Sequence, residues 1–230
     1  DYVQQDTTVA IDGQITDWGV EKVKAPVMHT HGVTGKGVKI AILDTGVDLK
    51  HPDLRVVGGA CVLSYCPNSY QDDNGHGTHV AGIIAAKDND IGTVGVAPDA
   101  SIYAVKVLDR YGEGNVSDIL SGIEWAMKHR VDIINLSLAA PEDAPALKAA
   151  IRKAYESGIL VVAAAGNNGY ANGTGDTVEY PAKYDSAIAV SAVNKENVRL
   201  PYSATGPAIE VAAPGEGVYS TVPVALDGDG

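Results

Sequence analysis

Residues 131–165 read VDIINLSLAAPEDAPALKAAIRKAYESGILVVAAA, and this stretch decides the fold. Its two ends, 131–136 and 159–165, are apolar runs of strand length. Between them, residues 144–157 carry apolar side chains at helical spacing, with Asp143 as the expected N-terminal cap. A strand, a helix and a second strand that is apolar on both faces form the repeating unit of a parallel sheet covered on both sides.

The same alternation extends along the chain in both directions. Further apolar runs typical of buried strands occur at 38–43, 101–107, 187–192 and 210–213. Helical spacing recurs at 78–86 and at 116–128, the latter with Ser117 as the expected cap. Two stretches, 58–75 and 166–181, are expected to be long loops. We therefore predict a one-domain α/β protein with a mostly parallel central sheet and helices on both faces.

Composition and charge exclude several classes of protein. The 230 residues are 45% apolar and 20% charged, which is enough for one sizeable core and excludes a disordered or fibrous chain. The 29 acidic residues exceed the 17 basic ones, and the net charge of −12 disfavours nonspecific binding to nucleic acid or to an anionic membrane. The longest apolar run, 159–165, is far shorter than the roughly 20 residues that cross a bilayer. Neither nucleic acid nor a membrane is an expected partner.

The chain has two cysteines, Cys61 and Cys66, in a loop-like region. They are too few to form a zinc site by themselves. A local disulfide between them would stabilise the fold by about 1–2 kcal/mol, because the closed loop is short. Two free thiols are the alternative. Since disulfides persist in oxidising compartments, the pair favours a secreted, extracellular protein.

Three polar residues stand at the ends of apolar elements. Asp44 directly follows the run 38–43, and Asn167 follows the run 159–165. His76 lies just before a predicted helix. In an open parallel sheet, functional groups collect beyond the carboxyl ends of the strands. We therefore expect these three side chains to lie near one another.

These residue types suit one kind of chemistry. A buried aspartate such as Asp44 requires a partner, because its ionised form loses hydration. A helix N-terminus disfavours the charged form of His76, so a carboxylate would be needed to hold one tautomer and favour the imidazolium transiently. Such a pair is the base half of a nucleophilic triad, in which histidine takes a proton from a hydroxyl and returns it to the leaving amine. Asn167 is suited to donate its amide to a developing oxyanion.

Six stretches of the sequence resemble motifs of the subtilase family, the subtilisin-type serine proteases. They are ILDTG at 42–46, HPDL at 51–54, GHGTHVAG at 75–82, GVAP at 95–98, NLSL at 135–138 and AAGN at 164–167. The resemblance implies a subtilisin-like three-layer fold and a serine endopeptidase that acts on proteins and peptides. Asp44 would be the orienting acid, His76 the general base and Asn167 the oxyanion donor.

The resemblance also implies a set of substrate-binding residues. Two extended segments would hold the substrate backbone as a strand between them: Gly112, Glu113 and Gly114 on one side, and Ser137, Leu138 and Ala139 on the other. A plain turn is the alternative for the first segment. The first specificity pocket would be lined by Ala164, Ala165, Gly166 and Glu179. Ala139 replaces the family's usual glycine, and its methyl group would narrow the pocket entrance. The carboxylate of Glu179 would accept Lys or Arg if it faces the pocket, whereas the sequence favours a solvated position at the rim.

The segment 87–93, KDNDIGT, interrupts a helical run with oxygen-rich side chains and a glycine. Calcium takes six to eight oxygen ligands of this kind. The matching loop of subtilases binds calcium, and this implies the ligands Gln14, Asp53, Asn89 and the carbonyls of Lys87, Ile91 and Thr93. A simple acidic surface loop is the alternative.

The family's nucleophile motif, Gly-Thr-Ser-x-Ala-x-Pro at the start of a long buried helix, does not occur in the 230 residues. Ser137, Ser203 and Ser220 lie in stretches that match other parts of the family, and we do not expect them to replace it. Loss of the nucleophile lowers turnover by about a millionfold, a figure that comes from a subtilisin. We therefore expect residues 13–230 to be a partial catalytic domain that is inactive by itself.

Two further expectations follow. The remaining C-terminal part of the enzyme would be a partner of this chain, and residues 1–12 would be an N-terminal extension or the tail of an inhibitory propeptide. A catalytically inactive homologue that binds peptides is the alternative function. The presence of Asp44, His76 and Asn167 together argues against it, because a binding groove needs neither a base nor an oxyanion donor.

Overall fold

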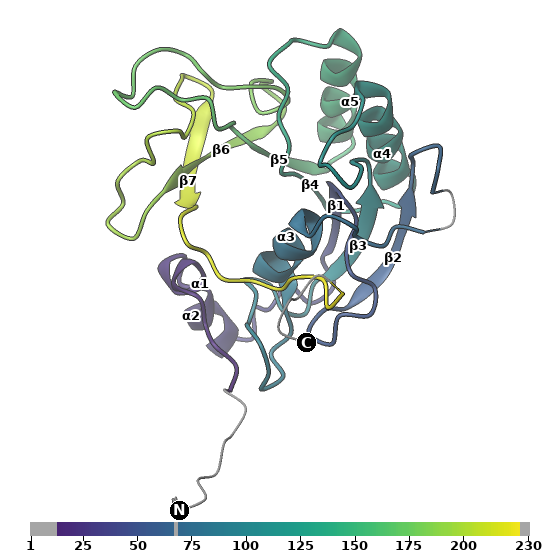
Figure 1. Ribbon diagram of the computed structural model, residues 1–230, viewed down its shortest axis with the longest axis vertical. Helices are drawn as coiled ribbons and strands as arrows, with labels where there is room; N and C mark the ends of the chain where they lie inside the picture. Colours follow the sequence, from purple (N-terminus) through teal and green to yellow (C-terminus); the bar gives the residue numbers. More distant parts are fainter. Residues whose placement is uncertain (1–12, 67–68, 226–230) are drawn as a thin grey trace, which may run out of the picture.

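A parallel sheet organises the part of the chain that the computed structural model describes, residues 13–66 and 69–225 (Figure 1). Its seven strands have the order β2-β3-β1-β4-β5-β6-β7, and every neighbouring pair is parallel. The strands are β1 (Lys39–Asp44), β2 (Val56–Cys61), β3 (Ser101–Lys106), β4 (Ile133–Leu136), β5 (Leu160–Ala164), β6 (Ile188–Val193) and β7 (Ile209–Pro214). The predicted α/β class is confirmed. The prediction for residues 1–12 lies outside the described residues.

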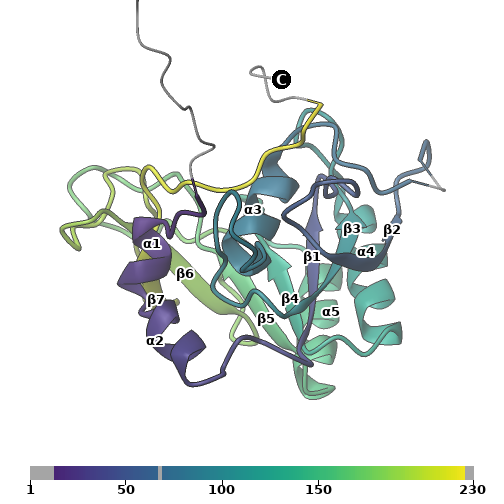
Figure 2. The same ribbon diagram turned by 90° about the horizontal axis from the view of Figure 1, so that it is seen from below.

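Helices cover both faces of the sheet (Figure 2). They are α1 (Trp18–Lys22), α2 (Ala25–Thr30), α3 (His76–Ala85), α4 (Val116–Lys128) and α5 (Pro145–Glu156). Strand β1 shows how the faces divide, since its successive side chains point to opposite sides. Leu43 packs in the core with α4 and α5, whereas Ile42 packs in the core with α3.

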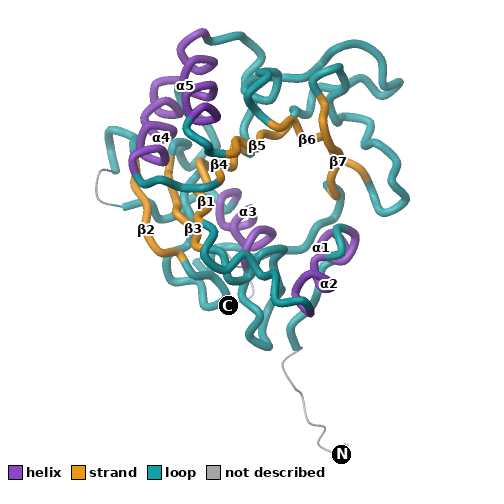
Figure 3. Tube along the Cα trace, turned by 180° about the vertical axis from the view of Figure 1, so that it is seen from behind, coloured by secondary structure: helices purple, strands orange, loops and turns teal. Residues whose placement is uncertain are grey.

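On the side of the sheet that α3 covers, the side chains of β5 and β6 are only partly covered. In β5, Val161 is buried in the core beneath α4 and α5, whereas Val162 and Ala164 are only half-buried. Together with Val190 and Ala192 of β6 they line a cavity of about 380 Å³. Figure 3 shows α3 beside β1, and α1 beside β7, the last strand at one edge of the sheet. An apolar surface between these two helices therefore has no helix of the described residues on it.

The prediction of a long loop at 58–75 is wrong at its start, because β2 (Val56–Cys61) occupies it. The sequence does not predict this strand, because two consecutive glycines lack the apolar side chains typical of one. Close packing requires Gly59, where a Cβ would collide with Ala104 O, and at Gly58 a Cβ would be in tight contact with the ring of Tyr103. The strand pairs only with β3 and lies at the edge of the sheet.

Both predicted helix caps are wrong. Helix α4 is capped by Asn115, whose backbone N–H donates to Asp118 at 3.1 Å, so Ser117 is already inside the first turn. Helix α5 follows Ala144, which has no capping side chain. Asp143 instead accepts a hydrogen bond from the hydroxyl of Tyr184 at 2.9 Å. Asp143 therefore bonds to a residue distant in sequence and does not cap the helix that follows it.

Cys61 and Cys66 form a disulfide, as expected, which closes a short loop at the end of β2. Within the described ranges, none of the helices has the length and apolar character needed to span a bilayer.

Candidate active site

Asp44 and His76 are in direct contact at the carboxyl end of β1. Asp44 is the last residue of the strand and is fully buried, and His76 is the first residue of α3. His76 Nδ1 lies 2.8 Å and 2.9 Å from the two carboxylate oxygens of Asp44. A carboxylate only accepts hydrogen bonds, so Nδ1 carries the proton and Nε2 is left to take up another. The pair can therefore accept a proton at Nε2 and release it again.

The hydrogen bond to Asp44 is the main influence on the pKa of His76. It raises the pKa above its ordinary value of 6.5, against the opposing effect of burial, and the charges of Asp44 and Asp72 add to it. The side chain is still 49% exposed, so the ring can be reached by a substrate. An imidazole whose pKa lies near working pH is suited to general acid–base chemistry.

Asp72 holds the segment that carries His76, and sequence reasoning missed it. Its side chain is buried and accepts hydrogen bonds from Thr45 Oγ1 at 2.8 Å, Asn74 N at 3.0 Å and Gly75 N at 2.9 Å. Its second oxygen accepts from Thr78 N at 2.9 Å and Thr78 Oγ1 at 2.6 Å. One carboxylate thus joins the end of β1 to the first turn of α3. The acidic residues that precede His76 in the sequence are the feature that could have indicated this role. A solvent-exposed loop has the same composition, so the feature is not specific.

Lys106 is a second buried charge beside the site. It stands opposite Asp44 in the pairing of β1 with β3, and its side chain is 2% exposed. Its Nζ donates to Thr45 O at 2.6 Å and to Asp73 Oδ1 at 2.7 Å. A buried ammonium of this kind needs such partners. In sequence, Lys106 looks like an ordinary residue of an apolar strand.

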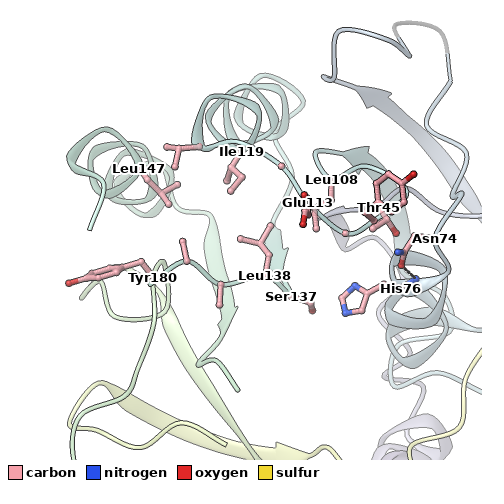
Figure 4. A pocket seen from close by; sticks show the side chains of 16 residues that line it. Thr45, Asn74, His76, Leu108, Glu113, Ile119, Ser137, Leu138, Leu147 and Tyr180 are labelled. Atoms are coloured by element: carbon pink, nitrogen blue, oxygen red, sulfur yellow. Dashed lines mark hydrogen bonds between the residues drawn. The ribbon is translucent and has the colours of Figure 1, made fainter. Parts of the chain in front are cut away.

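The two predicted substrate-binding segments line one groove together with His76 (Figure 4). The groove has a volume of about 660 Å³, with Gly112, Glu113 and Gly114 on one side and Ser137, Leu138 and Ala139 on the other. A turn that starts at Asp109 includes the first two residues of the first segment: Gly112 N donates to Asp109 O at 3.1 Å, and the side chain of Asp109 accepts from Tyr111 N at 2.8 Å and Glu113 N at 3.0 Å. In Figure 4, the ring of His76 faces Ser137 across the groove.

An apolar hollow adjoins this groove. Figure 4 shows Ile119 of α4 and Leu147 of α5 directed toward Leu138. Leu108 and Val116 complete the lining. Only Leu138 was identified from the sequence. Ile119 and Leu147 have the spacing of ordinary helix core residues, and nothing in a periodic pattern separates a core position from the wall of a hollow.

The predicted pocket residues form two facing walls. Ser137, Gly166 and Asn167 line a second cavity with His76, and Asn167 is exposed there. Glu179 is not among the residues that line this cavity; it is half-buried, and its backbone N–H donates to Ala165 O at 2.9 Å.

The chain is similar to known proteins over most of its length. Residues 35–227 match a family model described as "Subtilase family". The chain belongs to the subtilase family. It is 50% identical over 222 residues to Subtilisin E of Bacillus subtilis (strain 168), covering 96% of this chain and 58% of that protein. It is 52% identical over 211 residues to Subtilisin DY of Bacillus licheniformis, covering 91% of this chain and 76% of that protein.

An Alkaline protease of Shouchella clausii is also similar to this subtilase. It is 46% identical over 222 residues, which are 96% of this chain and 57% of that protein. The chain thus spans less than three fifths of the length of Subtilisin E and of the Alkaline protease.

The six residues predicted as calcium ligands come together in this subtilase. Gln14 Nε2 lies at the centre of four oxygens: Lys87 O, Asn89 Oδ1 at 3.4 Å, Ile91 O at 3.2 Å and Thr93 O at 3.0 Å. The nitrogen and the oxygen of a glutamine amide are told apart by such contacts. If the amide of Gln14 is turned over, its oxygen joins the four others.

Asp53 completes this set of oxygens. It is 2% exposed, its Oδ2 accepts from Thr93 N at 3.1 Å, and burial raises its pKa. Its Oδ1 is buried without a hydrogen-bond partner among the described residues. Within those residues, no group of three or more His, Cys, Asp or Glu side chains could hold a metal. A cation held by these residues would have one carboxylate, amides and carbonyls as ligands, which suit calcium.

Proposed function

We propose that the protein containing this chain is a serine endopeptidase that hydrolyses peptide bonds in proteins. The contact between the buried carboxylate of Asp44 and His76 Nδ1, at the edge of a substrate-sized groove, carries the proposal. Asp44 would hold the ring in one tautomer and stabilise the imidazolium. His76 would take a proton at Nε2 from a hydroxyl nucleophile and return it to the leaving amine. The amide of Asn167 would donate to the developing oxyanion.

We propose that a segment outside the 230 residues supplies the nucleophilic hydroxyl. The apolar cavity lined by Val162, Ala164 and Val190 also contains His76 and Asn167 in its walls. An apolar helix on this surface would complete the core and bring a hydroxyl between base and oxyanion donor. The remaining C-terminal part of the enzyme is the proposed partner, and residues 13–230 alone would be a partial, inactive domain.

The substrate backbone would lie as an added strand between 112–114 and 137–139. The hollow formed by Ile119, Leu138 and Leu147 would take an apolar side chain of the substrate, because these three side chains are apolar. The methyl group of Ala139 would narrow the entrance of the first pocket.

The test is labelling of the full-length protein with a serine-directed phosphonate, together with casein hydrolysis. We expect one labelled serine, in a Gly-Thr-Ser sequence, and loss of hydrolysis on labelling. A full-length protein that binds casein peptides, takes no label and hydrolyses nothing would instead be an inactive, peptide-binding homologue.

We also propose that the loop 87–93, Gln14 and Asp53 bind calcium. The unpartnered Oδ1 of Asp53 and the four oxygens around Gln14 support it, since a divalent cation would satisfy them all. When bound, calcium would supply positive charge that joins the segment at Gln14 to the loop.

Removal of calcium is expected to lower the thermal stability of the protein. At a calcium concentration of about 100 times the Kd, binding contributes about 2.7 kcal/mol, so EDTA should lower the Tm by about 5–10 °C. Asp53→Asn should lower the Tm and make it insensitive to EDTA. The exposed Asp88→Asn, in the same loop, should behave like the wild type. A wild-type Tm that EDTA leaves unchanged would remove calcium from the proposal.

We further propose that the protein is secreted, which the disulfide between Cys61 and Cys66 supports. Residues 1–12 would be an N-terminal extension or the tail of an inhibitory propeptide. N-terminal sequencing of secreted material distinguishes the two.

A further inference from the structure

The two walls of the first pocket are joined at their base by residues 179 and 180. Tyr180 and Ala140 exchange two backbone hydrogen bonds, of 2.7 Å and 2.9 Å, which attach this segment to the wall that begins at Ser137. The backbone N–H of Glu179 donates to Ala165 O at 2.9 Å, which attaches it to the opposite wall. The side chain of Glu179 therefore starts from the segment that connects the two walls.

The carboxylate of Glu179 lies directly against Gly166. A Cβ at residue 166 would collide with Glu179 Oε2, and Gly166 has a φ of +109°, which side-chain-bearing residues rarely adopt. The other oxygen, Oε1, accepts a hydrogen bond from Asn168 Nδ2 at 2.8 Å. The glycine thus makes room for a carboxylate beside the wall formed by Ala165, Gly166 and Asn167.

The charge of this carboxylate has no cationic partner among the described residues. The nearest cation in sequence, Lys183, forms an ion pair with Asp176 at 2.8 Å. An ionised carboxylate has about four acceptor positions, and the hydrogen bond from Asn168 uses one of them. A half-buried carboxylate in this state attracts a cation that arrives between the walls.

We propose that Glu179 makes the first specificity pocket select a lysine or arginine side chain, which rests on the proposed endopeptidase function. The half-buried Ala164, which lines the cavity beside Gly166, offers an apolar surface for the alkyl stem of such a side chain. The charged head would then meet the carboxylate of Glu179 beside Gly166. The substrate class is proteins cleaved after a basic residue.

The experiment compares kcat/KM of the full-length protein for two peptides that differ only in the residue before the scissile bond. One peptide has lysine there and the other has norleucine, which has a similar chain without the charge. Glu179→Gln should lower the ratio of lysine to norleucine by about 10- to 100-fold, the worth of a charged hydrogen bond. The norleucine value should change little, since glutamine keeps an oxygen for the hydrogen bond from Asn168.

Two further readouts separate a charge effect from a structural one. A third peptide with glutamate before the scissile bond should be cleaved faster by Glu179→Gln than by the wild type, because a repulsion is removed. Salt should lower the lysine preference of the wild type and leave that of the variant unchanged. The matched control is Asp185→Asn, an exposed carboxylate in the same segment, which should keep the wild-type ratio.

The outcomes separate this inference from the proposed function. If the wild type cleaves the norleucine peptide and the ratio is the same in Glu179→Gln, Glu179 does not select the substrate and the inference is wrong. If the wild type cleaves none of the peptides and no casein, the endopeptidase function itself fails, and the inference fails with it. If the glutamine variant does not fold, a wild-type lysine preference that does not fall with salt overturns the inference.

Discussion

Replacing Asp44 with asparagine is expected to lower the kcat/KM of the full-length protein by about ten thousandfold, a loss of the size measured for this change in other serine proteases. The carboxylate of Asp44 accepts the Nδ1 proton of His76 at 2.8 Å. An asparagine amide can donate to Nδ1 instead, which moves the proton to Nε2. The ring would then present a donor to the nucleophile and could not act as its base.

The pH dependence of this variant gives an independent readout. The base must be neutral, so the acid limb of the activity profile follows the pKa of His76. Because the hydrogen bond that His76 donates to Asp44 raises that pKa, the residual activity of Asp44→Asn should have its acid limb at lower pH than the wild type.

The control is Asp132→Asn. Asp132 is an exposed carboxylate at the opposite end of β1, where it accepts from Lys39 N at 2.8 Å. This variant should keep wild-type activity and the wild-type pH profile. An Asp44→Asn protein with full activity and an unshifted profile would contradict the proposed role of the pair.

Replacing Asp72 with alanine is expected to lower the free energy of unfolding by about 3–4 kcal/mol, near the upper end for a single substitution. Asp72 accepts five hydrogen bonds in a buried position, and alanine would leave those donors without a partner. Urea denaturation of the full-length protein at constant calcium measures the loss.

Activity should also fall in Asp72→Ala, through the position of His76. Asp72 does not contact the groove, but it holds both Thr45, next to Asp44, and the first turn of α3. We expect a lower kcat with a nearly unchanged KM, because the substrate-binding segments are untouched. Recovery of part of the stability in Asp72→Asn, which keeps one acceptor oxygen, would support this positioning role.

Asp109→Ala is the matched control for burial. Asp109 also accepts backbone N–H groups, from Tyr111 and Glu113, but it is only half-buried, so water can replace it. Its loss of stability should be much smaller than that of Asp72→Ala. Equal losses in the two variants would show that burial of the hydrogen-bonded carboxylate is not what matters.

The contrast between Asp44 and Asp72 explains how far the sequence could be interpreted. Asp44 follows a strongly apolar strand directly, and a carboxylate at such a place needs a functional explanation. Asp72 lies in a polar stretch, QDDNG, in which every residue is compatible with a solvated loop. Its importance arises only because Thr45, 27 residues earlier, lies beside it in the fold.

The errors in secondary structure have the same origin. Helix α4 was predicted with its observed bounds, since its amphipathic pattern is local. Strand β2 was missed because Gly58 and Gly59 lack the side chains that mark a strand, and the reason for those glycines is the approach of Tyr103 and Ala104 from β3. Asp143 was mistaken for a cap because its true partner, Tyr184, is 41 residues away.

The sequence by itself determined the alternation of strands and helices, the placement of Asp44, His76 and Asn167 at element ends, and the oxygen-rich loop 87–93. These follow from periodicity and residue chemistry over short spans. The tertiary structure alone decided that Asp72 holds the base, that Ile119 and Leu147 line a hollow, and that the carboxylate of Glu179 lies against Gly166. Those properties depend on which distant residues become neighbours, because hydrogen bonds and close packing act over a few ångströms of space and not along the chain.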